Sequence, residues 1–249
     1  MKPKPVRQRL DLLLVERGLA ESPERAGAMI LAGEVQVDGK RADKAGTPFP
    51  NIAKIKIISR HQKYVSRGGF KLQGALKDFA ICPKSRICLD IGSSHGGFTD
   101  CLLQLGAARV YAVDVNVEQL DWKLRQDLRV IPIKRNAREL TAQDVPERVD
   151  LVTIDVSFIS VLQAIAPAAN LAKPGAIFLI LIKPQFELPR DKVGAGGIVK
   201  SKKLHERAVL SVRTGLKPIG LKFLKVRPSR LAGAEGNQEY FLHARKKSG

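Results

Sequence analysis

The chain has 249 residues, of which 44% are hydrophobic, so it is long enough to bury one or two cores and too apolar to be wholly disordered. Its formal net charge is +19, because 43 Lys and Arg outnumber 24 Asp and Glu. No apolar run reaches the roughly 18 residues of a membrane span, the N-terminus has no secretory signal, and the three cysteines lack zinc-site spacing. These features disfavour a pore, a disulfide scaffold and a zinc module, and we expect a cytoplasmic protein.

The positive charge is concentrated at the two ends of the chain. The net charge is +8 over residues 1–80, +1 over residues 81–197 and +10 over residues 198–249. An excess of this size attracts a polyanion, and nucleic acid is the commonest candidate. Two alternatives are charge that serves solubility alone and binding to an anionic membrane surface, although no basic amphipathic helix with aromatic anchors is apparent.

The N-terminal region predicts two short helices. Residues 9–17 predict a helix that ends at Gly18, which suits the left-handed position after a helix. Residues 22–24, with the sequence Ser-Pro-Glu, supply the N-cap, the first-position proline and the first-turn acid of a second helix. We expect this second helix to end at Gly33.

A small sheet is predicted to follow the helices. Residues 35–37 alternate like a strand, the Asp-Gly at 38–39 is a hairpin signal, and residues 55–58 would close the sheet. Basic side chains near these elements would form one RNA-binding face, and the candidates are Arg9, Arg25, Lys40 and Arg41.

These residues resemble the RNA-binding module of ribosomal protein S-four, which also occurs in pseudouridine synthases and tyrosyl-tRNA synthetases. The resemblance rests on Arg-Leu-Asp at 9–11, Ser-x-x-Arg-Ala at 22–26 and Asp-Gly at 38–39, in the order of the family. It implies that the first sixty residues bind structured RNA. The alternative is a helical hairpin with an ordinary solvated face.

Residues 87–114 have the layout of a Rossmann-like nucleotide site. A predicted strand over 87–91 runs into a glycine turn at 92–98 and a helix closed by Gly106, and a second strand ends in Asp114. The glycines let the backbone approach a ligand closely, and the acid can accept hydrogen bonds from both hydroxyls of a ribose.

The turn favours a nucleotide without phosphates. Its Gly-x-x-x-Gly-Gly pattern is neither the dinucleotide fingerprint nor a phosphate-binding loop, and Asp90 just before it suits the cationic end of S-adenosylmethionine. His95 could instead stabilise the turn, and Phe98 could belong to the core. The candidate cofactor-binding residues are Asp90, Gly92, Ser94, His95, Gly96, Gly97, Phe98, Asp114, Val115, Asn136, Ala137 and Asp155.

Two further predicted strands end in residues suited to chemistry. The strand over 150–155 ends in Asp155, and the strand over 177–182 runs directly into Lys183. Ligands gather at the carboxyl edge of open α/β sheets, where both residues would lie. Alternatively, Asp155 is the N-cap of the next helix and Lys183 is a solvated charge at a strand end.

Five motifs, at residues 64–72, 89–100, 153–160, 181–187 and 235–241, closely resemble the TlyA family, which is often labelled hemolysin A. The resemblance implies an α/β fold: a Rossmann-like, FtsJ-like methyltransferase domain over 61–249, preceded by a small α+β RNA-binding domain over 1–60 and a linker at about 59–66. It also implies 2′-O-methylation of ribose in ribosomal RNA, at cytidine in the best-known members. The cofactor would be S-adenosylmethionine, and the partner would be ribosomal RNA or ribosomal subunits.

The FtsJ-like group uses a Lys-Asp-Lys-Glu tetrad, which the motifs carry onto Lys71, Asp155, Lys183 and Glu239. Lys183 would stabilise the alkoxide that develops on the ribose or accept its proton, and Lys71 would add positive charge. The two acids would orient the lysines. Arg67, in the same motif as Lys71, is a further candidate RNA contact, and no metal ligands are expected.

The sequence departs from the family at Asn116, where glycine is common, and at residues 188–189, where small residues are common. These positions bear on the choice of nucleotide more than on the reaction. Other acceptors fit less well, because Cys82 lacks the context of a C5-pyrimidine nucleophile and no Pro-Pro follows Asp155. The alternatives are a non-catalytic ribosome-assembly factor and a membrane-active hemolysin, although no stable membrane association is expected.

Overall fold

The computed structural model describes residues 6–57, 63–233 and 236–248. The chain divides into two compact units, Met1–Gln62 and Lys63–Gly249, whose boundary lies two residues beyond the predicted one. Part of the predicted linker lies outside the described residues. The rest belongs to the second unit, since Tyr64 is 1% exposed and packs in that unit's core.

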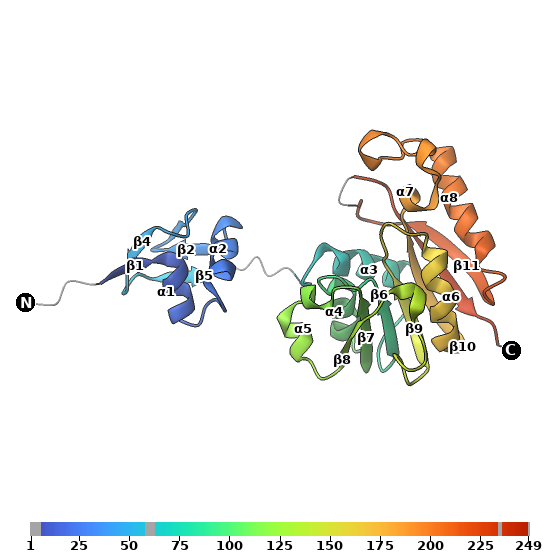
Figure 1. Ribbon diagram of the computed structural model, residues 1–249, viewed down its shortest axis with the longest axis horizontal. Coiled ribbons are helices and arrows are strands. Elements are labelled where there is room, and N and C mark those ends of the chain that lie inside the picture. Colours follow the sequence, from blue (N-terminus) through green and yellow to red (C-terminus); the bar gives the residue numbers. More distant parts are fainter. Residues whose placement is uncertain (1–5, 58–62, 234–235, 249) are drawn as a thin grey trace, which may run out of the picture. The chain divides into compact units, whose positions relative to one another are not determined.

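The first unit is a small α+β fold (Figure 1). Strands β3, β2 and β5 form an antiparallel sheet, and β1 pairs with β4 in a second, two-stranded sheet. The elements are β1 (Arg7–Arg9), α1 (Leu10–Glu16), α2 (Pro23–Leu31), β2 (Val35–Val37), β3 (Lys40–Arg41), β4 (Pro48–Pro50) and β5 (Ile55–Ile57).

Local sequence signals account for most of this unit. The Ser22 side chain caps α2 by accepting a hydrogen bond from the N–H of Arg25 at 3.2 Å, and Gly33 follows the helix with φ +70°. Asp38 and Gly39 have φ values of +51° and +83°, as the two central residues of a type I′ hairpin turn require. Both predicted helices and the three-stranded sheet are confirmed, whereas the β1–β4 pair was not predicted.

The second unit is built on a seven-stranded sheet in the order β11-β12-β10-β9-β6-β7-β8 (Figure 1). The five strands from β10 to β8 are parallel, while β12 is antiparallel to both β10 and β11. The strands are β6 (Ile87–Ile91), β7 (Arg109–Asp114), β8 (Val130–Lys134), β9 (Val149–Ile154), β10 (Ala172–Ile182), β11 (Leu221–Pro228) and β12 (Tyr240–Lys246).

Helices cover both faces of this sheet. Side chains of α6 and α8 share one apolar core with the sheet, and side chains of α3, α4 and α5 share the other. Burial on both faces explains why the central strands are apolar almost throughout. The helices are α3 (Arg67–Asp78), α4 (Gly97–Gln104), α5 (Trp122–Gln126), α6 (Val161–Leu171), α7 (Pro184–Glu187) and α8 (Lys202–Gly215), with short 3-10 turns η1 (Val117–Gln119), η2 (Ala137–Glu139), η3 (Arg190–Lys192) and η4 (Ala195–Gly197).

The four strands predicted for this unit are confirmed as β6, β7, β9 and β10, and β10 begins five residues earlier than expected. Strands β11 and β12 were not predicted. The N-cap of α6 is Ser160, so the alternative in which Asp155 caps the next helix is wrong. No helix in the described parts of the chain is long and apolar enough to cross a membrane.

Candidate active site

The site lies where the strand order of the sheet reverses. From β6 the chain continues to β7 on one side, whereas β9 leads to β10 on the other side. Open α/β sheets bind ligands at such a point, beyond the carboxyl ends of the strands. Gly92 and Asp155 directly follow β6 and β9, and the N–H of Asp155 donates a hydrogen bond to the carbonyl of Ile91 at 2.9 Å.

The turn after β6 requires its glycines. Gly92 has φ +80°, and a Cβ on it would lie 2.2 Å from the carbonyl oxygen of Asp155. Gly96 has φ +92°, and a Cβ there would overlap the side chain of Leu124 at 2.2 Å. Gly92 therefore lets the turn approach the end of β9. Gly96, a predicted cofactor residue, lets α5 pack under the turn instead and lines no pocket of the site.

Asp90 supports the turn from below. Its side chain is 0% exposed, and its two carboxylate oxygens accept hydrogen bonds from Thr99 Oγ1 at 2.7 Å and Thr153 Oγ1 at 2.8 Å. Burial raises the pKa of Asp90 to about 6, although both hydrogen bonds oppose the shift. Because the carboxylate is enclosed by protein, the expected contact between Asp90 and a cofactor is corrected: the residue ties α4 to β9.

Two adjoining pockets open beside the turn and share Gly92, Ser94 and Asp155. The first, the Asp114 pocket, has a volume of about 350 Å³ and is also lined by the predicted residues Asp114, Val115, Asn136 and Ala137. The second, the glycine-turn pocket, has a volume of about 180 Å³ and is also lined by Ser66, Arg67, Gly68, Lys71, Ser93, Gly97, Phe98 and Ala232.

The polar groups of these pockets suit S-adenosylmethionine. The carboxylate of Asp114 accepts one hydrogen bond on each oxygen, from the N–H groups of Ser94 at 2.9 Å and Asn116 at 3.0 Å, which leaves acceptor capacity for ribose hydroxyls. Ser93 Oγ is buried, has no hydrogen-bond partner among the described residues, and lines the glycine-turn pocket. A bound polar group would satisfy Ser93, which the sequence did not single out.

Three predicted residues have other surroundings. His95 is exposed, lies 3.2 Å from Ser94 Oγ through Nδ1, and lines neither pocket, so the structure favours its role in the turn. Phe98 stacks on Phe241 with 6.0 Å between ring centroids and is mostly a core residue with one edge at the pocket. Arg67 lines the glycine-turn pocket and donates to the carbonyl of Ala232 at 3.4 Å.

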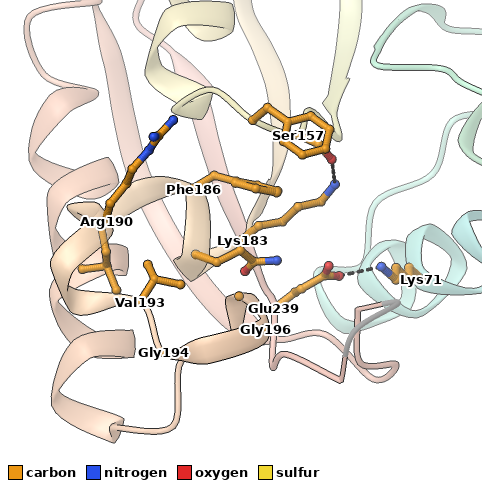
Figure 2. Close-up of a pocket in the computed structure, with 13 residues that line it drawn as sticks. Lys71, Ser157, Lys183, Phe186, Arg190, Val193, Gly194, Gly196 and Glu239 are labelled. Atoms are coloured by element: carbon orange, nitrogen blue, oxygen red, sulfur yellow. Dashed lines mark hydrogen bonds and ion pairs between the residues drawn. The ribbon is translucent and has the colours of Figure 1, made fainter.

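The four tetrad residues form two ion pairs, of which Figure 2 shows the pair of Lys71 and Glu239. Lys71 of α3 pairs with Glu239, which precedes β12, at 2.6 Å between Nζ and Oε2. Lys183, at the end of β10, pairs with Asp155 at 2.6 Å between Nζ and Oδ1, and its Nζ also donates a hydrogen bond to Ser157 Oγ at 2.8 Å. The family resemblance therefore grouped four residues that are distant along the chain and that form two close pairs in space.

The two pairs lie between a third pocket and the cofactor pockets. This lysine pocket, of about 790 Å³, is lined by Lys71, Lys183 and Glu239 together with side chains of the α7–η4 segment. Lys71 also lines the glycine-turn pocket, and Asp155 lines both cofactor pockets. Buried ion pairs contribute little net stability, so a functional role explains this cluster better.

An aromatic pair lines the lysine pocket beside Lys183. Phe158 is 89% exposed and has φ +69°, and its ring centroid lies 5.3 Å from that of Phe186. A positive φ is costly for a phenylalanine, and the exposed ring borders the lysine pocket. Neither aromatic residue was singled out from the sequence.

Glu187 joins the two loops that carry the Lys183–Asp155 pair. Its Oε2 accepts a hydrogen bond from Ser160 Oγ at 2.7 Å, and its Oε1 accepts one from the N–H of Val161 at 2.8 Å, at the start of α6. Burial raises the pKa of Glu187 above its usual value, against the lowering effect of both hydrogen bonds. Only its place in the Pro-Gln-Phe-Glu motif could have indicated this role.

The predicted RNA-binding residues of the first unit, Arg9, Arg25, Lys40 and Arg41, are all exposed. Arg9 forms an ion pair with Asp11 at 2.6 Å between Nη2 and Oδ2, so part of its charge is compensated. The remaining three form no ion pair with the described residues.

Comparison with known proteins places these features in a family. The FtsJ-like methyltransferase family matches residues 64–246, and the S4 domain family matches residues 8–49. The 16S/23S rRNA (cytidine-2′-O)-methyltransferase TlyA of Mycobacterium tuberculosis is 44% identical over 241 residues, which cover 96% of this chain and 90% of the relative.

Two further relatives carry hemolysin names. Hemolysin A of Brachyspira hyodysenteriae is 40% identical over 94% of this chain and 98% of its own length. A solved structure of a hemolysin-like protein from Streptococcus thermophilus is 37% identical, with a TM-score of 0.74 over 99% of this chain and 90% of that one. The chain therefore belongs to the TlyA family of FtsJ-like, S-adenosylmethionine-dependent methyltransferases, in which an S4 domain precedes the methyltransferase domain.

Proposed function

We propose that this chain methylates the 2′-oxygen of a cytidine ribose in ribosomal RNA. The observation that carries the proposal is the meeting of two Lys–carboxylate pairs between the lysine pocket and the cofactor pockets. The printed activity of the Mycobacterium tuberculosis relative supports both the ribose oxygen and the cytidine. Because ribosomes would provide its substrate, the proposal includes a cytoplasmic location.

Methyl transfer requires little activation of the donor. S-adenosylmethionine supplies a methyl group on a sulfonium centre, so the remaining tasks are to position the acceptor and to manage its proton. A ribose hydroxyl is a poor nucleophile at neutral pH. Negative charge develops on its oxygen as the proton leaves, and the oxygen then bonds to the methyl carbon while the bond from that carbon to sulfur breaks. Preorganised positive charge beside that oxygen lowers the barrier.

Lys183 is the group that provides this charge. Its Nζ is held by Asp155 on one side and by Ser157 Oγ on the other, so the ammonium is oriented before the substrate arrives. Lys183 stabilises the developing alkoxide, and its amine lies in position to relay the proton of the hydroxyl. Asp155 Oδ1 lies 2.6 Å from Lys183 Nζ, so the carboxylate is placed to receive a proton that the lysine relays.

The second pair orients the substrate from the other side. Lys71 and Glu239 are 12% and 3% exposed in their side chains, so each is largely removed from solvent. Lys71 lines both the lysine pocket and the glycine-turn pocket, and it adds positive charge where the acceptor and the donor meet. Glu239 holds Lys71 in place and keeps acceptor capacity for a ribose hydroxyl.

The aromatic pair supports a nucleotide as the substrate. Phe158 and Phe186 line the lysine pocket, and a nucleobase that stacks on such rings gains about 1–3 kcal/mol per base. The exposed cations of the first unit provide further contacts to the RNA backbone.

Nucleoside mass spectrometry of ribosomal RNA tests this proposal. RNA from cells that express the protein should contain 2′-O-methylcytidine that is lacking in cells without the gene, and expression of the wild-type protein should restore it. Methylation on a base, or identical nucleoside profiles in both strains, would contradict the proposal. Leakage of dye from vesicles by the purified protein would instead support the hemolysin names of the relatives.

A further inference from the structure

A row of cations follows β11 and β12, away from the methyl-transfer site. Lys222 pairs with Arg245 in the β11–β12 register, and Lys225 pairs with His243. Side chains alternate between the faces of a sheet, and the register shift after Phe223 keeps Lys225 on the face of Lys222. We define the basic edge as the exposed residues Lys222, Lys225, Arg227, Arg245 and Lys247.

Protection of a sheet edge explains only part of this pattern. Lysines on an edge strand prevent pairing with another chain, and β11 is an edge strand. Arg245, however, lies on β12, which is paired on both sides. It stands directly opposite Lys222, and like charges in this position destabilise a sheet. The fold therefore retains a repulsive pair that edge protection does not need.

The segments that carry the basic edge contain no acidic residue of their own. Residues 216–233 and 240–248 contain eight Lys and Arg and no Asp or Glu. Within the described residues, Arg230 is the one cation of these segments in an ion pair, and its partner Asp78 has a pKa that is lowered chiefly by Arg230 and also by Arg227. The Nζ of Lys246 donates hydrogen bonds to the backbone carbonyls of Ala169 and Ala172, so this lysine is not counted in the basic edge.

The basic edge leads away from the active site along the sheet. Arg227 pairs with Phe241, two residues after Glu239, and therefore lies near the carboxyl edge of the sheet. Lys222 precedes Arg227 in β11, and their partners on β12, Arg245 and Phe241, are four residues apart, which is about 14 Å at the usual rise of a strand. There, Lys222, Arg245 and Lys247 line an open hollow of about 530 Å³. An extended row of this length matches a polymer of anions better than a single ion.

We propose that the basic edge binds the phosphate backbone of RNA and extends the RNA contact from the active site along β11. The inference rests on the proposed function in taking RNA as the polyanion. Binding by the basic edge does not depend on the nucleotide sequence of the RNA, because its lysine and arginine side chains contact phosphates and not the edges of the bases. It therefore sets how strongly the substrate is held, and the lysine pocket decides which ribose reacts.

The test compares two double variants with the same change in charge. Lys222→Gln with Arg245→Gln removes the opposed pair, and Lys123→Gln with Arg125→Gln removes two exposed cations of α5, which packs on β8 at the other edge of the sheet. Binding of a fluorescent ribosomal RNA fragment is measured by anisotropy over a series of salt concentrations, and melting temperature and S-adenosylmethionine affinity are measured in parallel.

The basic-edge variant should lower the slope of log K against log salt by about 2, one for each lost phosphate contact. Its affinity at about 0.1 M salt should fall on the order of tenfold. The α5 variant should bind as the wild type does. Melting temperature should be unchanged or higher in the basic-edge variant, because a repulsive pair is removed, and cofactor affinity should not change.

An unchanged slope, or an equal loss in the α5 variant, would overturn the proposal. Aggregation of the basic-edge variant with intact RNA affinity would assign these residues to edge protection instead. Loss of binding to vesicles with anionic lipid, with RNA binding intact, would assign them to a membrane surface. Methyl transfer by the wild type is assayed separately, so failure of the proposed function is distinguished from failure of the basic edge.

Discussion

Asp90 should make the stability of the methyltransferase unit depend on pH in an unusual direction. Its pKa is raised from 3.8 to about 6 in the folded protein, chiefly by burial. A raised pKa means that the contribution of this group to stability is fully present below pH 3.8 and is lost as the pH rises through 6. The full shift corresponds to about 3 kcal/mol at 1.36 kcal/mol for each unit of pKa.

The variant Asp90→Asn removes this titration while keeping the shape of the side chain. The difference in free energy of unfolding between variant and wild type should therefore shift in favour of the variant by about 2–3 kcal/mol between pH 4 and pH 7. Urea unfolding can be followed by the fluorescence of Trp122, the single tryptophan, which lies in this unit.

Asp150→Asn provides a control with the opposite sign. The pKa of Asp150 is lowered in spite of its burial, by hydrogen bonds from Lys173 and from the N–H of Ile87 and by the charge of Lys173. Its stabilisation is present above pH 3.8 and is lost as the pH falls, so this variant should lose more stability at pH 7 than at pH 4. An Asp90→Asn difference that is constant with pH would refute the account of Asp90.

Three further predictions concern the ligand contacts and the loops. Asp114→Ala should weaken S-adenosylmethionine binding in calorimetry by about tenfold or more, because a carboxylate that accepts ribose hydroxyls is lost, and unchanged affinity would exclude this contact. Glu187→Ala should lower kcat more than cofactor affinity, because the loops of Asp155 and Lys183 lose their connection, and an equal kcat would show that the connection is only structural. Arg25→Glu with Lys40→Glu should weaken RNA binding and steepen the loss of methylation with salt, while cofactor binding stays at the wild-type value.

Local signals in the sequence account for the part of the fold that holds the cofactor. The strand, glycine turn and acid between Ile87 and Asp114 are contiguous, so their spacing alone predicts the geometry that the structure shows. The tetrad residues lie far apart along the chain, and only the family resemblance grouped them before the structure brought Lys71 to Glu239 and Lys183 to Asp155.

The remaining features depend on long-range packing. Strands β11 and β12 mix apolar and basic residues and pair with each other and with β10, so no short pattern identifies them. The sequence analysis assigned Asp90 to the cofactor because the residue directly precedes the glycine turn. In the structure its carboxylate accepts hydrogen bonds from the hydroxyls of Thr99 and Thr153 instead. Ser93 became visible only as a buried hydroxyl without a partner.

Single-turnover methylation by Lys183→Ala tests the central claim most directly. Lys173→Ala is the matched control, because Lys173 lies near the other end of β10 and pairs with Asp150 at 2.7 Å. With ribosomal RNA and S-adenosylmethionine both bound, Lys183→Ala should transfer methyl on the order of 10²-fold more slowly than the wild type or the control. Lys183→Arg should not restore the rate, since a guanidinium stays protonated and is wider. A rate for Lys183→Ala within a few-fold of the wild type would contradict the assignment of the tetrad.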